Sequence, residues 1–69
     1  MESEKDIRSY TVSEILEMAL KREKASYRFY DKIVKNTSVS TLVETIEQLR
    51  EEEYKHIKMI EKKIAGLGL

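Results

Sequence analysis

Two long stretches without a helix-breaking residue, separated by one polar turn, constrain the fold of this 69-residue chain more than any other feature. The chain has no Pro, and its two Gly both lie within the last four residues. In each stretch apolar residues recur at steps of three and four, the spacing of one face of an α-helix. The chain is therefore expected to be all-α, with two helices of roughly 25 residues, each on the order of 37 Å long.

Residues that favour helix caps indicate where these two helices begin and end. The segment Thr11–Glu14 fits a capping box, in which the first and fourth residues bond each other's backbone N–H groups. Ser38 is the preferred N-cap of the second helix, with Thr41 as the alternative, and Gly66 fits a left-handed C′ position. The expected organisation is a flexible N-terminal arm over 1–10, a helical hairpin over 11–66 with helix 1 at about 11–36 and helix 2 at about 39–65, and a short tail over 67–69.

Composition narrows the range of partners and chemistries. Thirteen basic and thirteen acidic residues balance, and no basic stripe interleaved with aromatic residues suggests nucleic-acid binding. The absence of Cys excludes disulfides, zinc–thiolate sites and thiol catalysis. Apolar runs are too short for a membrane span, so a cytoplasmic location is expected, without a nucleic-acid or membrane partner.

A lone hairpin would leave half of each apolar stripe exposed, and so short a chain rarely stabilises a core of its own. Two hairpins packed together would bury both stripes in an antiparallel four-helix bundle. We therefore expect a two-helix antiparallel hairpin that dimerises into a four-helix bundle, as a homodimer or a higher homo-oligomer.

Three ionisable residues interrupt the expected apolar seams of the two helices. Glu23 occupies a seam position of helix 1, and Glu53 and His56 occupy seam positions of helix 2, where an unpaired charge would be expensive to bury. The expected seams are Leu16, Leu20, Glu23, Tyr27, Tyr30 and Val34 in helix 1, and Leu42, Ile46, Leu49, Glu53, His56 and Ile60 in helix 2.

The register of the hairpin should bring these residues to one level. Glu23 lies thirteen residues before Asn36, and Glu53 lies thirteen residues after Ser40. His56 follows Glu53 on the same face, because residues three apart on a helix are neighbours. With a second copy the layer would hold four carboxylates and two imidazoles, a donor set for two metal ions of the Fe(II) or Mn(II) class, with zinc as a substitute. Without metal, such crowded acids should be partly protonated, or the metal-free dimer should be looser.

At this point the residues resemble a known family. The run Ala19–Tyr30, in which Glu23 is followed at +6 and +7 by Phe29 and Tyr30, is similar to the first helix of ferritin-like, rubrerythrin-type di-iron proteins. The stretch Leu49–His56 resembles their second helix. The resemblance implies a ferritin-like four-helix bundle with two Fe ions per dimer.

The resemblance also implies a role for each site residue. Glu23 would be a terminal ligand, Glu53 a bridging ligand and His56 a terminal ligand. Tyr30 would be a phenol that hydrogen-bonds a ligand carboxylate, and Tyr27 is a weaker candidate for the same position. Both tyrosines are also explained as core aromatics whose hydroxyls find partners.

The chain departs from the usual pattern of that family in three ways. Family members usually carry two hairpins in one chain, many carry a cysteine-ligated rubredoxin module, and ferritins add a short fifth helix. Any electron donor would therefore be a separate protein, and a self-made storage shell is not expected. The tail over 67–69 loosely resembles the Gly/Leu-containing tails by which some ferritin-like cargo docks inside protein shells.

Two functional hypotheses follow. The first is a di-iron carboxylate oxidoreductase that oxidises Fe(II) with O2 (a ferroxidase), reduces peroxide or senses oxygen, with no catalytic residue beyond the metal ligands. The second is a helical interaction module, whose polar layer fixes register and partner choice without metal. Metal content would separate the two hypotheses.

Overall fold

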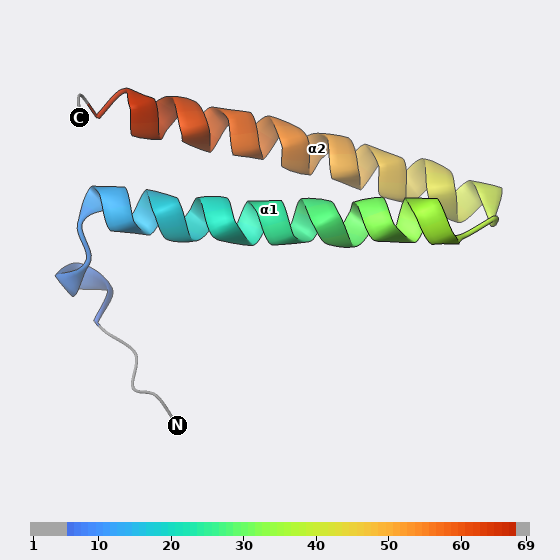
Figure 1. Cartoon of the computed structure of the whole chain (residues 1–69), viewed down its shortest axis with the longest axis horizontal. Helices are drawn as coiled ribbons and strands as arrows, with labels where there is room; N and C mark the ends of the chain where they lie inside the picture. Colours follow the sequence, from blue (N-terminus) through green and yellow to red (C-terminus); the bar gives the residue numbers. More distant parts are fainter. Residues whose placement is uncertain (1–5, 68–69) are drawn as a thin grey trace.

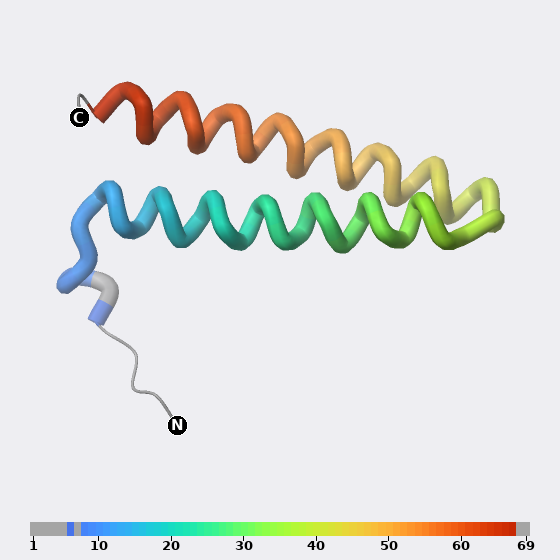
Figure 2. Tube along the Cα trace, viewed as in Figure 1, coloured from blue at the N-terminus to red at the C-terminus, as the bar shows by residue number. Residues whose placement is uncertain are grey.

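The computed structural model describes residues 6–67, which form two long antiparallel helices joined by a tight turn (Figure 1). A single 3-10 turn, η1 (Ile7–Ser9), precedes helix α1 (Val12–Asn36), and helix α2 (Ser40–Ala65) runs back along it. The trace in Figure 2 shows the first residues of α1 beside the last residues of α2, at the end of the hairpin opposite the turn. The expected all-α hairpin is confirmed, whereas its pairing with a second copy stays a prediction.

The predicted capping box at the start of α1 is confirmed. The hydroxyl of Thr11 accepts a hydrogen bond of 3.0 Å from the Glu14 N–H, and the Glu14 carboxylate accepts one of 2.8 Å from the Thr11 N–H. Two of the backbone donors that the first turn leaves without a helical partner are thereby satisfied.

The turn differs from the prediction at the start of α2. The N-cap is Val39, with no side-chain cap, so neither Ser38 nor Thr41 caps this helix. The reason is local: Thr37 ends α1 as its C-cap, and its hydroxyl accepts a 3.3 Å hydrogen bond from the Val39 N–H. This short connection leaves Ser38 inside the turn and Thr41 already within the helix.

The C-terminal cap of α2 also differs from the prediction. Gly66 has φ −73° and ψ −6°, in the right-handed region, and not the left-handed conformation expected of a C′ glycine. The Gly66 N–H donates to the Lys62 carbonyl at 3.0 Å and the Leu67 N–H donates to the Ile64 carbonyl at 3.1 Å, so the last turn closes without a left-handed residue. Leu67 is the only residue of the expected tail within the described part, and 68–69 lie outside it.

The core is small and lies between the two helices. Leu20 of α1 packs with Ile57 and Ile60 of α2, and Ile46 is buried nearer the turn. Burial of each such side chain stabilises the folded state by roughly 1.5–3 kcal/mol, because apolar surface is removed from water. None of the side chains that the structure describes, at 6 and 8–67, is completely buried. The core is therefore thin for a hairpin of this length, which favours additional burial against another molecule.

The predicted seam of α1 is confirmed, and that of α2 is rotated by about one residue. All six predicted α1 seam residues are buried or half-buried. In α2, by contrast, Leu42, Leu49 and His56 are exposed. The line of α2 that packs on α1 is Val43, Ile46, Arg50, Glu53, Ile57, Ile60 and Ile64. The apolar stripe of α2 is wider than one contact line, so its period alone did not fix which edge faces α1.

An ion pair that the sequence did not predict crosses the same interface. Arg50 donates a 2.7 Å hydrogen bond from Nη1 to Oδ1 of Asp31, and Lys35 lies 2.9 Å from the other Asp31 oxygen. Both the Asp31 and Arg50 side chains are about one quarter exposed. The pair therefore occupies the edge of the core, where the arginine takes the place of an apolar contact residue.

The expected N-terminal arm is only partly within the described residues. Residues 1–5 lie outside them, whereas Ile7–Ser9 form the turn η1, beside which Asp6 and Arg8 form an ion pair of 2.7 Å. Neither α1 nor α2 has an apolar stretch long enough to cross a membrane.

Candidate metal centre

The three predicted ligands converge at the middle of the hairpin. Glu23 comes from the centre of α1, and Glu53 and His56 come from successive turns of α2. The Nδ1 atom of His56 lies 3.5 Å from Oε2 of Glu23 and 3.7 Å from Oε1 of Glu53. One ligand atom from each residue falls within 4.8 Å of the others. The register argument from the sequence therefore placed these side chains correctly relative to one another.

The three side chains of the cluster differ in exposure, because they run from the interior of the hairpin to its surface. The side chain of Glu53 is 18% exposed, that of Glu23 is 29% exposed and that of His56 is 48% exposed. The two carboxyl groups thus lie in the helix–helix interface, and the imidazole lies at its edge. A cation held by all three would be bound from the side of the hairpin where His56 is open to solvent.

A hydrogen bond with a neighbouring carboxyl group raises the pKa of Glu53. The largest cause is a hydrogen bond with the Glu23 carboxyl group, followed by burial and by repulsion from the Glu23 charge, while His56 acts in the opposite direction. A hydrogen bond between two carboxyl groups requires a proton on one of them. The expected tendency of these crowded acids to keep a proton is therefore supported for Glu53, and a bound cation would take the place of that proton.

The donor set suits a divalent first-row metal. Each chain offers two carboxylates and one imidazole, and carboxylate oxygens favour ions such as Mn and Fe while imidazole suits Fe and Zn. One Glu on one helix and a Glu-x-x-His pair on the next is the half-set found twice in carboxylate-bridged di-metal bundles. A single hairpin thus carries half of the donors that such a centre requires.

The two tyrosines lie near the cluster in sequence but have different surroundings. Tyr27 packs against the core, and its ring centroid lies 6.3 Å from that of Tyr54. Tyr30 is half-buried, with its ring centroid 5.6 Å from that of Phe29. A hydrogen bond from either hydroxyl to Glu23 or Glu53 stays a prediction.

The cluster opens onto an exposed apolar side of the hairpin. Successive residues of a helix are about 100° apart, so a residue that precedes a contact residue lies to one side of the contact line. The two helices are both right-handed and run in opposite directions. The residue that precedes a contact residue is therefore turned to the same side of the hairpin in both helices. We call this side the apolar face. Along it lie Ile15, Phe29, Leu42, Leu49 and His56, with the charged Arg22 and Glu52 beside the cluster.

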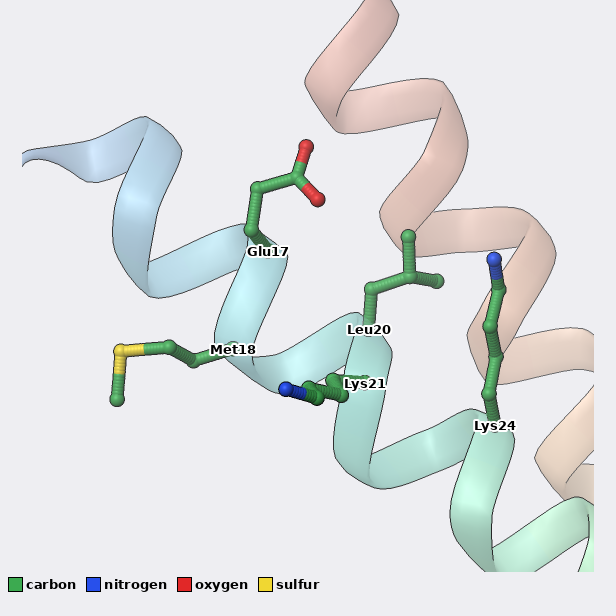
Figure 3. A pocket seen from close by; sticks show the side chains of 5 residues that line it. All are labelled: Glu17, Met18, Leu20, Lys21 and Lys24. Atoms are coloured by element: carbon green, nitrogen blue, oxygen red, sulfur yellow. The ribbon is translucent and has the colours of Figure 1, made fainter.

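Surface hollows elsewhere on the hairpin do not coincide with the cluster. One of about 420 Å³ is lined by Glu17, Met18, Leu20, Lys21 and Lys24, one turn before Glu23 along α1 (Figure 3). In Figure 3 the Met18 and Lys21 side chains extend away from α2. None of the three predicted ligands lines this hollow, so it does not contribute to the candidate centre.

The fold and the cluster together define a class: a helical hairpin that presents one carboxylate from its first helix beside a Glu-x-x-His pair of its second. The family model described as Rubrerythrin matches residues 2–68, nearly the whole chain, and the chain belongs to the rubrerythrin family. The comparison with curated proteins and the comparison with solved structures each give no match.

Proposed function

We propose that two copies of this chain pack through their apolar faces and bind two iron ions between them, with Mn or Zn as substitutes. The observation that carries the proposal is the convergence of Glu23, Glu53 and His56 within 4.8 Å. Membership of the rubrerythrin family supports it independently of the geometry. A second copy would complete the donor set to four carboxylates and two imidazoles.

The exposure of the apolar face supports a second copy as its partner. Ile15 is 38% exposed, Phe29 is 61% exposed, Leu42 is 42% exposed and Leu49 is 36% exposed. These residues lie on the same side of the hairpin as His56, which is 48% exposed. A copy placed there would cover apolar surface and bring its own three donors to the open edge of the cluster.

Each ligand has a distinct part in this proposal. Glu53, the most buried donor, would give up its shared proton to a cation and so couple metal binding to proton release. Glu23 would bind the same cation from the opposite helix, α1. His56 must be neutral to bind through nitrogen, so binding should weaken as the imidazole becomes protonated.

A pair of iron ions, when bound, supplies electrons to O2 or peroxide, and we propose oxidoreductase chemistry of this class in the cytoplasm. Fe(II) oxidation and peroxide reduction are its two forms, differing in whether iron is the substrate or a resident cofactor. The chain has no Cys with which to hold a second redox centre of the thiolate type. A sustained reductive cycle would therefore need a separate electron donor.

The test is metal content measured together with mass. The protein is loaded anaerobically with Fe(II), freed of excess metal and examined by elemental analysis and light scattering. We expect two metal ions for every two chains, in a species of at least dimeric mass. Glu53→Gln and His56→Ala should lose the metal, whereas the matched exposed neighbours Glu52→Gln and Lys55→Ala should keep it. A metal-free wild-type dimer would favour the helical interaction module instead.

A further inference from the structure

A second surface of α2 carries a charge pattern that the metal centre does not use. Its N-terminal half is acidic and its C-terminal half is basic along one exposed side. We call this side the charged stripe, which consists of Glu44, Glu47, Glu51, Lys55, Lys58 and Lys62. Each of these residues follows a contact residue of α2 by one or two positions, so the stripe lies away from α1 and away from the apolar face.

The charges of the stripe are mostly without partners inside the hairpin. Lys58 pairs with Glu61 at 3.3 Å and lies over the Tyr54 ring, 5.3 Å from its centroid. Within residues 6–67 the other five members of the stripe take part in no ion pair. Glu51 and Lys55 have the helical spacing for one, yet they do not form it. The stripe therefore keeps both signs of charge available to another molecule.

The arrangement of these charges is self-complementary. Glu44 lies nine residues before Glu53 and Lys62 lies nine residues after it. Glu51 lies two residues before Glu53 and Lys55 lies two residues after it. Glu47 lies six residues before Glu53 and Lys58 lies five residues after it. If a second α2 were laid antiparallel on the first with a two-fold axis at residue 53, every acid would face a base. If the second α2 ran parallel to the first at the same level, each acid would face an acid and each base would face a base.

We propose that the charged stripe is a second self-association surface, through which α2 helices of two copies pair antiparallel about a two-fold axis at the level of Glu53. The occupant is a second copy because a stripe divided into opposite halves matches its own inverted image. A partner of uniform charge would match only one half and be repelled by the other. This contact does not depend on metal, and it uses a different side of α2 from the proposed dimer.

Two self-complementary surfaces on one chain have a consequence for assembly. A contact of each kind is isologous, so each copy can join one neighbour through its apolar face and another through its charged stripe. Copies would then alternate between the two contacts, and closed assemblies would contain an even number of chains. The stripe thus determines whether the proposed dimers remain separate or join.

Exposed ion pairs are weak and screened by salt, and they contribute specificity and orientation more than affinity. The stripe contact should therefore be lost at high ionic strength, whereas burial of the apolar face should not weaken. Salt dependence distinguishes the two surfaces. It also separates failure of this proposal from failure of the proposed function.

The experiment is sedimentation velocity on the full chain at about 20 mM and about 500 mM NaCl, where the screening length changes severalfold. We expect self-association beyond the apolar contact at low salt, weakened about tenfold or more at high salt. Glu44→Lys with Glu51→Lys makes the stripe basic, and Lys55→Glu with Lys62→Glu makes it acidic. Each pair of reversals should abolish the salt-sensitive species.

Charge-swap rescue provides the decisive comparison. A mixture of the two reversed variants should associate, and so should a single variant with all four reversals, because each restores opposite charges across the contact. Lys21→Glu with Lys24→Glu on α1 is the matched control, which should leave the assembly unchanged. The proposal is overturned if the wild-type mass does not change with salt, or if the reversed variants assemble like the wild type.

Discussion

The Nδ1 atom of His56 lies 3.5 Å from Oε2 of Glu23, across the boundary between the two helices. Because one residue comes from α1 and the other from α2, the cluster exists only when the hairpin is formed. A Glu-x-x-His pair on an isolated helix would supply two donors, and the third depends on tertiary structure. Metal binding and folding of this chain should consequently be linked.

Replacing Glu53 with Gln should stabilise the metal-free protein while it removes metal binding. Folding raises the pKa of this carboxyl group, so ionised Glu53 is less favourable in the folded state than in the unfolded chain. The neutral amide keeps a hydrogen bond with Glu23 without the repulsion, a gain on the order of 1 kcal/mol. Urea unfolding of the metal-free protein measures it. Glu52→Gln, a neutralisation at an exposed neighbour, should give no comparable gain, and a marked loss in E53Q would contradict the assignment.

Replacing His56 with Ala should leave the metal-free stability nearly unchanged and abolish stabilisation by metal. The imidazole is about half exposed and lies outside the core, so its removal leaves no cavity. For the wild type, a metal present at 100 times its Kd should add about 2.7 kcal/mol to the free energy of unfolding. Thermal unfolding with and without Mn(II) measures the difference. An equal shift of Tm in the variant would rule out His56 as a ligand.

Stability in acid should depend on Asp31. Lys35, and secondarily Arg50, lowers the pKa of the Asp31 carboxyl group in the folded state. The unfolded value is about 3.9, so this stabilisation is present above that pH and is lost as the pH falls through the lower folded-state pKa. Wild type should therefore exceed Asp31→Asn in stability at pH 7, and the difference should shrink in strong acid.

Asp6→Asn is the matched control for this pH dependence. Hydrogen bonds from Arg8 lower the pKa of Asp6 as well, but both residues precede α1 and contribute nothing to the helix–helix contact. Global unfolding of that variant, followed by circular dichroism between neutral and acidic pH, should track the wild type. A difference between D31N and wild type that stays constant with pH would assign Asp31 a packing role without an electrostatic one.

Truncation of Leu49 tests the apolar face without involving metal. In an isolated hairpin Leu49 is 36% exposed, so its replacement by Ala should cost only about 1 kcal/mol. If a second copy covers it, the cost should approach the roughly 2–4 kcal/mol of a core truncation such as Ile57→Ala, and unfolding should depend on protein concentration. Equilibrium unfolding at two protein concentrations separates these results. A small cost without concentration dependence would show that this face remains open.

The sequence allowed much of the fold to be predicted because its local rules agree. The three-and-four spacing, the capping box at Thr11 and the absence of Pro give two helices within one residue of the observed bounds. Counting outward from the turn placed Glu23 level with Glu53, because the rise per residue is the same in both helices. The N-cap of α2 was predicted wrongly, since Ser and Thr fit several positions in a turn whose geometry Thr37 decides.

What the sequence determined by itself is therefore the length, phase and level of the two helices, which follow from repeat spacing and backbone geometry. Which edge of α2 faces α1 was decided only by the tertiary structure: Val43, Arg50 and Ile57 lie in the contact, and Leu42, Leu49 and His56 lie outside it. The physical reason is that a stripe wider than one contact line can pack in two rotations differing by one residue. Side-chain packing selects between them, including the pairing of Arg50 with Asp31.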